Sequence, residues 1–287
     1  LARTARVPWL VTVHATEYGR HQGWVDKHPQ SHIHAVERRM VRDADRVITC
    51  SDFMRDHVNQ VFRVAKRKVT TIQNGIDPTD LDPMEPVDLV ALRARFAAPD
   101  ERLILLVGRL VYEKGFHLAL EALRPVIRRQ GNVRFVVCGT GTAEADLKEQ
   151  ARALKLTDHG TFLGWTGDDM LHSLYRVADL CVVPSIYEPF GLVALEAMAS
   201  GCLCLVADTG GLREVVPEDG TAALRFRARD PKSLAQMLEK MLTDENLRER
   251  LIEEARQHVL QFDWAEVARE TAAVYDELVT SATPSQV

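Results

Sequence analysis

Long apolar segments are missing from this chain of 287 residues. Its longest apolar runs, such as Leu103 to Val107 and Leu180 to Val183, fall far short of the ~20 residues that a membrane-spanning helix needs. We identify no signal peptide, and the cysteine pattern leads us to expect a cytoplasmic protein, either free or peripheral at the inner membrane face. The chain begins at Leu1 rather than Met, directly ahead of a strand-like run, and we expect it to be a fragment of a longer protein.

The sequence also lacks closely spaced pairs of cysteines. The five cysteines lie in apolar, strand-like contexts, and none forms a C-x-x-C pair, which predicts buried free thiols in a reducing compartment. The histidines near the N-terminus match no standard spacing of metal ligands, so we expect no metal. The cysteines are Cys50, Cys138, Cys181, Cys202 and Cys204, and the histidines are His14, His21, His28, His32 and His34.

The chain also lacks any nucleic-acid-binding motif, and its formal net charge is −5. The charge is uneven, because residues 1–78 carry 13 Lys and Arg against 8 Asp and Glu. A basic region can attract an anionic acceptor or a membrane surface. No basic amphipathic helix accompanies it, however, so solvated acidic helices elsewhere, such as Asp244 to Glu254, are the better-supported cause. Nucleic acid is therefore excluded as a partner, and peripheral membrane contact stays an alternative.

What the sequence does contain is an alternation of short apolar runs with helical stretches. The expected strands are 9–13, 46–50, 69–72, 103–107, 133–138, 160–163, 180–183 and 202–206, and the expected helices are 33–42, 53–62, 115–129, 143–154, 168–177, 191–200 and 264–279. Apolar strands separated by helices of this length predict parallel sheets that are covered on both faces.

A proline-rich stretch with Pro78, Pro83 and Pro86 divides this alternation into two series and reads as a linker. We therefore predict an α/β protein with two doubly wound, Rossmann-like domains. The first has about three strands, too few for an ordinary open sheet, so we expect it to be incomplete. The predicted boundaries are 1–82 for the first domain, 83–262 for the second and 263–287 for a C-terminal helix.

Ligands of open α/β sheets bind where strands run out into helices. The strand ending at Val107 continues into Gly108 and Arg109, and Lys114 follows at a helix start. Gly108 would let a ligand approach the backbone. Two cations and a helix N-terminus together favour a diphosphate, although two surface cations on a loop would look the same.

The strand ending at Val183 leads through a Pro-Gly turn into an almost wholly apolar helix. Glu196 lies within this helix and has no Lys or Arg within four positions, so we expect a ligand diol, such as a ribose, to satisfy it. A salt bridge from a distant helix is the alternative. Glu188 precedes the helix and could accept hydrogen bonds from sugar hydroxyls. The amides of Phe190, Gly191 and Leu192 would face a phosphate.

Other strand ends give weaker signals. The Cys138-Gly139-Thr140-Gly141 loop lacks the third glycine of a dinucleotide fingerprint, which argues against a dehydrogenase. The backbone around Leu163 could pair with a nucleotide base. A glycine loop at 208–212 could bring amides near the ligand. His14, at the end of the first strand, could orient or deprotonate an acceptor hydroxyl.

These residues together resemble a known family. The G-R-L-x-x-E-K-G string at 108–115 and the E-P-F-G-L-x-x-L-E-A-M-A-x-G string at 188–201 are similar to those of retaining GT-B glycosyltransferases of the glycogen-synthase-like group, the glycosyltransferase family 4 type. So are A-D-R-V-I-T-C-S at 44–51, I-x-N-G-I-D at 72–77 and the final helix with Trp264. The resemblance covers nearly the whole chain.

The resemblance implies transfer of a hexose from a UDP-, ADP- or GDP-hexose donor, with retention and without a metal or cofactor. Arg109 and Lys114 would neutralise the departing diphosphate, Glu188 would contact the transferred sugar, and Glu196 would hold the ribose. His14 would lie beneath the reacting sugar. The last helix would cross back to the first domain.

The string from His14 to Trp24 is similar to that of actinobacterial α-glucosyltransferases, which suggests a glucose donor and an α-glucan acceptor, within a wider range of glycan or glycolipid acceptors. Two alternatives stay open: a sugar-nucleotide epimerase of the same fold, and a non-catalytic module that binds nucleotide sugars. The oligomeric state is not indicated by the sequence.

Overall fold

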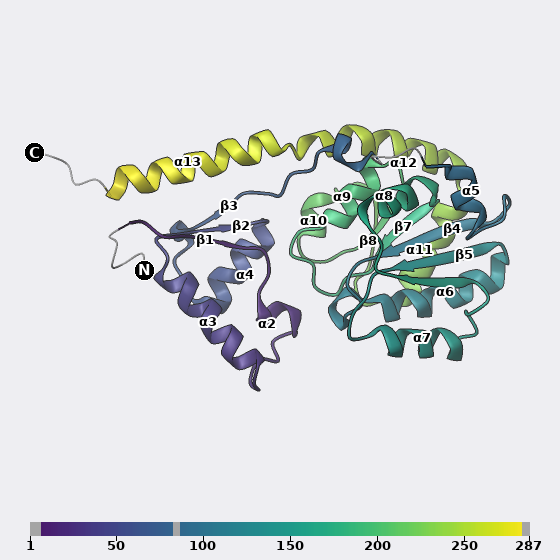
Figure 1. Ribbon diagram of the computed structural model, residues 1–287, viewed down its shortest axis with the longest axis horizontal. Coiled ribbons are helices and arrows are strands. Elements are labelled where there is room, and N and C mark those ends of the chain that lie inside the picture. The colour runs from purple at the N-terminus through teal and green to yellow at the C-terminus, as the bar shows by residue number, and fades with distance from the viewer. Residues whose placement is uncertain (1–6, 83–86, 283–287) are drawn as a thin grey trace, which may run out of the picture. The chain divides into compact units, whose positions relative to one another are not determined.

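A computed structural model describes residues 7–82 and 87–282 of the chain (Figure 1). It divides into two compact units. The first unit comprises residues up to Gly75 together with those from Phe262 onward, and the second comprises Ile76–Gln261. Among the helices described, none combines the length and the apolar character needed to cross a membrane.

The first unit contains a parallel sheet of three strands in the order β1-β2-β3, with Leu10 opposite Arg46 and Val47 opposite Val69. Two of its helices start where a side chain caps them: the Thr16 hydroxyl accepts from the Gly19 N–H, and the Ser51 hydroxyl accepts from the Met54 N–H, both at 3.0 Å. The elements are β1 (Leu10–Val13), α2 (Glu17–Arg20), α3 (Gln30–Asp43), β2 (Arg46–Thr49), α4 (Asp52–Phe62), the 3₁₀ helix η1 (Lys66–Lys68), β3 (Val69–Thr71) and α13 (Trp264–Ala282).

Helix α13 belongs to the first unit although it ends the chain. Val274 is buried with Ile48 and Ile72 in one small core, and Val267 and Leu278 of the same helix pack against it. A Cβ atom at Gly75 would lie 2.7 Å from the Trp264 ring, so the first turn of α13 requires a glycine there. The helical spacing of apolar residues after Trp264 therefore marks the face that covers this sheet.

The second unit contains a parallel sheet of six strands in the order β6-β5-β4-β7-β8-β9. Helices α6 and α7 lie on one side of it, and α8, α9 and α12 on the other (Figure 1). The strands are β4 (Arg102–Val107), β5 (Val133–Cys138), β6 (Gly160–Gly164), β7 (Leu180–Val183), β8 (Cys204–Ala207) and β9 (Leu224–Phe226). The helices are η2 (Pro78–Leu81), α5 (Leu89–Ala94), η3 (Tyr112–Lys114), α6 (Phe116–Gln130), α7 (Glu144–Ala153), α8 (Asp168–Val177), α9 (Leu192–Ala199), α10 (Leu212–Val215), α11 (Pro231–Thr243), α12 (Glu245–His258) and η4 (Val259–Gln261).

Residues 76–82 lie in the second unit, although the proline-rich pattern predicted that they belong to the first domain. Leu81 is buried there, and η2 contacts α8 and α9. The Arg176 guanidinium donates to the Leu81 carbonyl at 2.6 Å and pairs with Asp82. These contacts, which the local sequence does not reveal, hold the segment against the second unit. Pro83 and Pro86 of the expected linker lie outside the described residues.

All strands of the second sheet are parallel, but the order in which the chain adds them reverses between the neighbouring strands β4 and β7. From β4 the chain proceeds through β5 to β6 on one side, then returns to place β7 on the other side of β4. Such a topological switch point is where ligands bind to open α/β sheets, at the carboxyl ends of the strands. The loops after β4 and β7 are the two that flank it.

All five cysteines are buried and outside any disulfide, as the sequence predicted. Burial raises the pKa of the Cys138 thiol to about 12 and that of Cys202 well above its ordinary value. A thiol must ionise to act as a nucleophile or metal ligand. These two side chains therefore contribute to packing in the core of the second unit and not to chemistry.

His57 gives the first unit a pH-dependent stability. Burial lowers its pKa from 6.5 to about 4, and its Nε2 lies 2.7 Å from the Thr16 hydroxyl. Between pH 6.5 and pH 4 the His57 imidazole is protonated in the unfolded chain but neutral in the folded chain. The free energy of unfolding therefore falls as the pH drops from 6.5 to 4.

Between pH 7.5 and pH 5, we expect the free energy of unfolding to fall by about 2 kcal/mol more in wild type than in His57→Gln, at 1.36 kcal/mol per pKa unit. Urea unfolding at both pH values measures the difference. His32→Gln, at an exposed histidine of α3, is the control and should keep the wild-type loss. Equal losses in wild type and His57→Gln would disprove this assignment.

Candidate active site

The loop that follows β4 is built on close backbone contacts. Gly108 has a φ of +142°, and the Leu110 N–H donates to the Thr140 carbonyl at 2.8 Å. A Cβ atom at Gly139 would lie 1.9 Å from the Gly108 carbonyl oxygen. The glycine loop after β5 therefore supports the Gly108 loop.

The loops after β4 and β7 are joined by hydrogen bonds. The Glu113 carbonyl accepts from the N–H groups of Ile186 at 2.8 Å and Tyr187 at 3.2 Å. Gly115 has a φ of +70°, and a Cβ there would lie 2.0 Å from the Pro184 carbonyl oxygen. Only glycine fits this position, since a side chain would be strained and would also separate the loops.

This junction brings two predicted site residues into direct contact. The Lys114 ammonium lies 2.7 Å from Oε2 of Glu188, and their side chains are 20% and 10% exposed. The Ser185 hydroxyl, which is buried, donates to the same carboxylate oxygen at 2.9 Å. The pair therefore stands partly desolvated at the switch point, where a charge interaction is stronger than in water.

Arg109 is placed differently from Lys114. Its side chain is 61% exposed, and its guanidinium lies 3.9 Å from Glu113, too far for a hydrogen bond. An exposed guanidinium with planar donors suits an oxyanion. Arg109 can therefore turn toward an incoming anion without breaking a hydrogen bond to the buried Glu113.

The start of α9 rests on the loop that follows β8. Gly191 has a φ of +129°, and a Cβ there would lie 2.7 Å from the Leu212 side chain. The Gly211 N–H donates to the Glu188 carbonyl at 2.8 Å. Gly191 is the N-cap and provides no side-chain cap, so a ligand can approach the backbone before Ala194, whose N–H donates to the Gly191 carbonyl. Phe190 is buried, so only its backbone can face a ligand.

Glu196 corrects one premise of the sequence analysis. It was expected to be buried without a protein partner, but it is half-buried, and its Oε2 accepts a hydrogen bond from the Tyr175 hydroxyl at 2.9 Å. The partner comes from α8, 21 positions earlier in the chain. It is a neutral hydroxyl and not the cation of another helix. The carboxylate therefore keeps further acceptor capacity for a ligand.

The remaining candidates lie on other strand ends. The pairing of β5 with β6 steps from Val137 opposite Phe162 to Cys138 opposite Gly164. This irregularity passes over Leu163, whose backbone therefore departs from the regular ladder. His14 directly follows β1 in the first unit and is exposed.

The structure thus places most of the sequence-predicted residues together in the second unit, and it adds two that were missed. In the segments that follow β4 and β7 are Gly108, Arg109, Lys114, Glu188, Phe190, Gly191 and Leu192, and Glu196 lies farther along α9. Leu163 is at the end of β6, and His14 belongs to the first unit. The missed residues are Ser185 and Tyr175. Ser185 stands three positions before Glu188 and could have been noticed, whereas Tyr175 carries no local signal.

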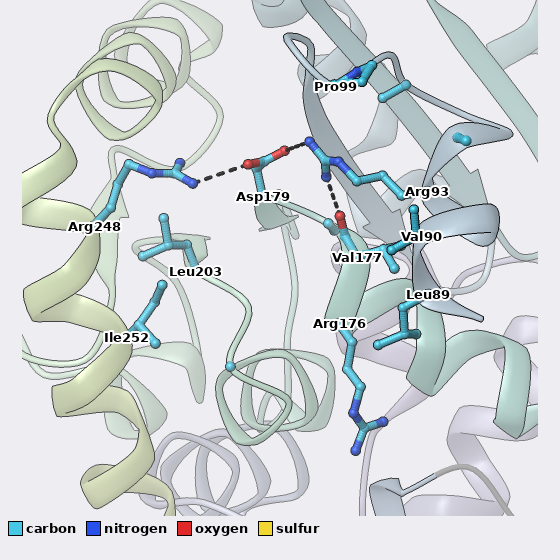
Figure 2. Close-up of a pocket in the computed structure, with 14 residues that line it drawn as sticks. Leu89, Val90, Arg93, Pro99, Arg176, Val177, Asp179, Leu203, Arg248 and Ile252 are labelled. Carbon is cyan, nitrogen blue, oxygen red and sulfur yellow. Dashed lines mark hydrogen bonds and ion pairs between the residues drawn. The ribbon is translucent and has the colours of Figure 1, made fainter. Parts of the chain in front are cut away.

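A hollow of about 550 Å³ in the second unit lies away from the candidate site, at the amino ends of the strands. Figure 2 shows Arg93 and Arg248 reaching Asp179 from opposite sides within it. Arg93 also donates to the carbonyls of Val177 and Glu101. Because these cations are already engaged, the hollow is poorly suited to binding a phosphate. No cluster of metal-ligating side chains was found in the described ranges.

Comparison with solved structures identifies the architecture as the GT-B fold of glycosyltransferases. Sucrose-phosphate synthase from Thermosynechococcus elongatus is 27% identical with a TM-score of 0.78, over 95% of this chain and 68% of that one. HepE from Anabaena, solved in complex with UDP-glucose, is 24% identical with a TM-score of 0.83, over 96% and 74%.

The chain belongs to the glycosyl transferases group 1 family, whose model matches residues 91–258. Residues 1–80 match Glycosyltransferase Family 4. A glycogen synthase from Mycobacterium tuberculosis is 39% identical over 280 residues, which is 96% of this chain. The chain spans 64% of the length of that relative. The family resemblance stated from the sequence is therefore confirmed.

Proposed function

We propose that the protein containing this chain transfers a hexose, with glucose as the first candidate, from a nucleoside-diphosphate sugar to a glycan, with an α-glucan as the first candidate acceptor. The observation that carries this proposal is the 2.7 Å pair of Lys114 with Glu188 at the switch point. Exposed Arg109 and the uncapped start of α9 lie on the same two loops.

The diphosphate is bound by cations and amides in this account. Lys114 and Arg109 hold the β-phosphate, and the amides at the start of α9 complete its coordination. When the phosphate arrives, Lys114 is shared between it and Glu188. The Glu188 carboxylate then accepts hydrogen bonds from hydroxyls of the sugar, while Ser185 keeps it in place.

The nucleoside is bound by groups that the reaction does not alter. Glu196 accepts hydrogen bonds from the ribose hydroxyls, and the irregular backbone at Leu163 pairs with the base. These contacts anchor the donor so that its anomeric carbon is presented beside Glu188.

The reaction breaks the bond between the anomeric carbon and the β-phosphate oxygen, and the acceptor hydroxyl forms the new bond on the same face. Its proton passes to the departing phosphate, so the configuration is retained. Lys114 and Arg109 stabilise the charge that develops on the diphosphate, which is the main contribution the chain makes to the rate. No metal is assigned to this step. The role of His14 beneath the sugar remains a prediction.

Two comparisons support the choice of donor and product. The mycobacterial relative is a glycogen synthase, and its match extends over 96% of this chain. HepE shows that a protein of this fold binds UDP-glucose. Peripheral contact with a membrane and cytoplasmic location remain part of the proposal.

A donor screen on the whole protein tests the function. UDP-, ADP- and GDP-glucose are supplied with glycogen or malto-oligosaccharides, and the product linkage is read by NMR. We expect an α-linked glucosyl product that forms only when donor and acceptor are both present. A sugar epimer formed without acceptor would instead establish an epimerase, and donor binding without any product would indicate a binding module.

A further inference from the structure

Tyr175 connects the core of the second unit to the candidate site. It lies near the end of α8, it is fully buried, and its hydroxyl donates to Oε2 of Glu196 at 2.9 Å. Glu196 is half-buried on α9 between Leu195 and Ala197, which are both buried. The Glu196 carboxylate thus accepts one hydrogen bond from the buried Tyr175 hydroxyl, while Glu196 itself stays partly accessible.

The tyrosine can act only as a hydrogen-bond donor toward this carboxylate. Burial raises the pKa of the Tyr175 hydroxyl well above its ordinary value, and the negative charge of Glu196 raises it further. The hydroxyl therefore stays protonated at any physiological pH. The surrounding core, including Cys181 and Cys202, is fully buried, so the ring has no room to change its rotamer.

A glutamate side chain that is fixed before the ligand arrives binds it more tightly, because binding need not order that side chain. An ionised carboxylate has about four acceptor positions, and the tyrosine occupies one of them. The others suffice for two neighbouring ligand hydroxyls. The hydrogen bond from Tyr175 thus orients the Glu196 carboxylate and leaves acceptor positions for the ligand.

We propose that Tyr175 is a positioning residue that holds Glu196 in the orientation required to accept both ribose hydroxyls of the nucleotide donor. This proposal rests on the proposed function, in which Glu196 contacts the ribose. It assigns part of the selectivity for a ribonucleotide to a buried residue of another helix.

The test compares nucleotides that differ only in the ribose hydroxyls. Equilibrium affinities are measured for UDP, ADP and GDP and for their 2′,3′-dideoxy analogues, using wild type and Tyr175→Phe. Phenylalanine keeps the ring and removes only the donor. Cys202→Ala is the matched control, since this fully buried side chain lies in the same core and donates to the Ala178 carbonyl, not to Glu196.

We expect Tyr175→Phe to bind the preferred ribonucleotide about tenfold more weakly and its dideoxy analogue with unchanged affinity. Cys202→Ala should change the two affinities by the same factor. Equal losses for both nucleotides in Tyr175→Phe, or no loss for either, would overturn the proposal, because a merely structural residue does not distinguish them.

Glu196→Ala separates failure of this inference from failure of the proposed function. If Glu196→Ala abolishes the preference for the ribonucleotide while Tyr175→Phe retains it, only the role of Tyr175 is wrong. If Glu196→Ala retains the preference, the assignment of Glu196 to the ribose is wrong as well. If wild type binds none of the three nucleotides, both the proposed function and the role of Tyr175 are wrong.

Discussion

Replacing Lys114 with alanine is expected to lower the turnover number for sugar transfer by about a hundredfold or more, the loss typical of removing a group that stabilises transition-state charge. Lys114 stands 2.7 Å from Glu188 with only 20% of its side chain exposed. In the proposed reaction, a cation that is largely removed from water would stabilise the developing charge of the leaving diphosphate more than water would. The same replacement also leaves Glu188 without its cation. Steady-state kinetics with saturating donor and acceptor measure the effect.

The control for this prediction is Lys148→Ala. Lys148 pairs with Glu144 on the exposed surface of α7, with 47% of its side chain accessible, so its loss should leave turnover unchanged. Arg109→Ala should resemble Lys114→Ala, with a loss of about a hundredfold. A loss of only a few-fold in both Arg109→Ala and Lys114→Ala would contradict the role assigned to these cations.

Replacing Asp179 with alanine is expected to destabilise the second unit by about 3–5 kcal/mol, the usual cost of breaking a buried ion pair on one side. Asp179 accepts from the Leu103 N–H at 2.8 Å and pairs with Arg93, Arg102 and Arg248. These partners come from β4, α5 and α12, so one carboxylate ties three elements together beside the hollow of Figure 2. Urea unfolding at neutral pH measures the change.

Asp82→Ala is the matched control for Asp179→Ala. Asp82 also pairs with an arginine, Arg176, but 73% of its side chain is exposed, so its loss should cost about 1 kcal/mol or less. Equal costs for the two variants would show that the Asp179 network is not a stabilising junction.

The lowered pKa of Asp179 makes its contribution to stability depend on pH. Burial alone would raise it, but the hydrogen bonds from Leu103 and Arg93 and the charges of Arg93 and Arg248 outweigh burial and lower it below 3.8. The stabilisation from Asp179 is therefore complete at neutral pH and is lost as the pH falls below about 3.8.

The arrangement of strands could be predicted because the central strands of the second sheet are mostly apolar: β7 and β8 contain only apolar residues, and β5 contains a single arginine. β5 and β7 match their predicted bounds, and β8 begins two positions later than expected, at Cys204. β9 was missed, since three residues, Leu-Arg-Phe, carry too little pattern to separate an edge strand from a loop. Helix α11 was also missed, although Asp230 caps it and Pro231 opens it.

The candidate site could be predicted only as far as strand ends reveal it. Topology alone brings the carboxyl ends of β4 and β7 together, so Lys114 and Glu188 were placed in one site from the sequence. Contacts between distant segments were invisible. The partner of Glu196 is 21 positions away, and Arg93 and Asp179 are 86 positions apart. For the same reason the sequence portrayed Glu196 as an unpartnered carboxylate.

The central claim is that Lys114, Arg109 and the start of α9 bind the diphosphate of the donor. A crystal structure of the protein with the nucleoside diphosphate preferred in the donor screen tests it most directly. We predict β-phosphate oxygens about 3 Å from the Lys114 ammonium and the Arg109 guanidinium, with the ribose hydroxyls on Glu196. A nucleotide bound away from the ends of β4 and β7, for example in the hollow beside Asp179, would contradict the account.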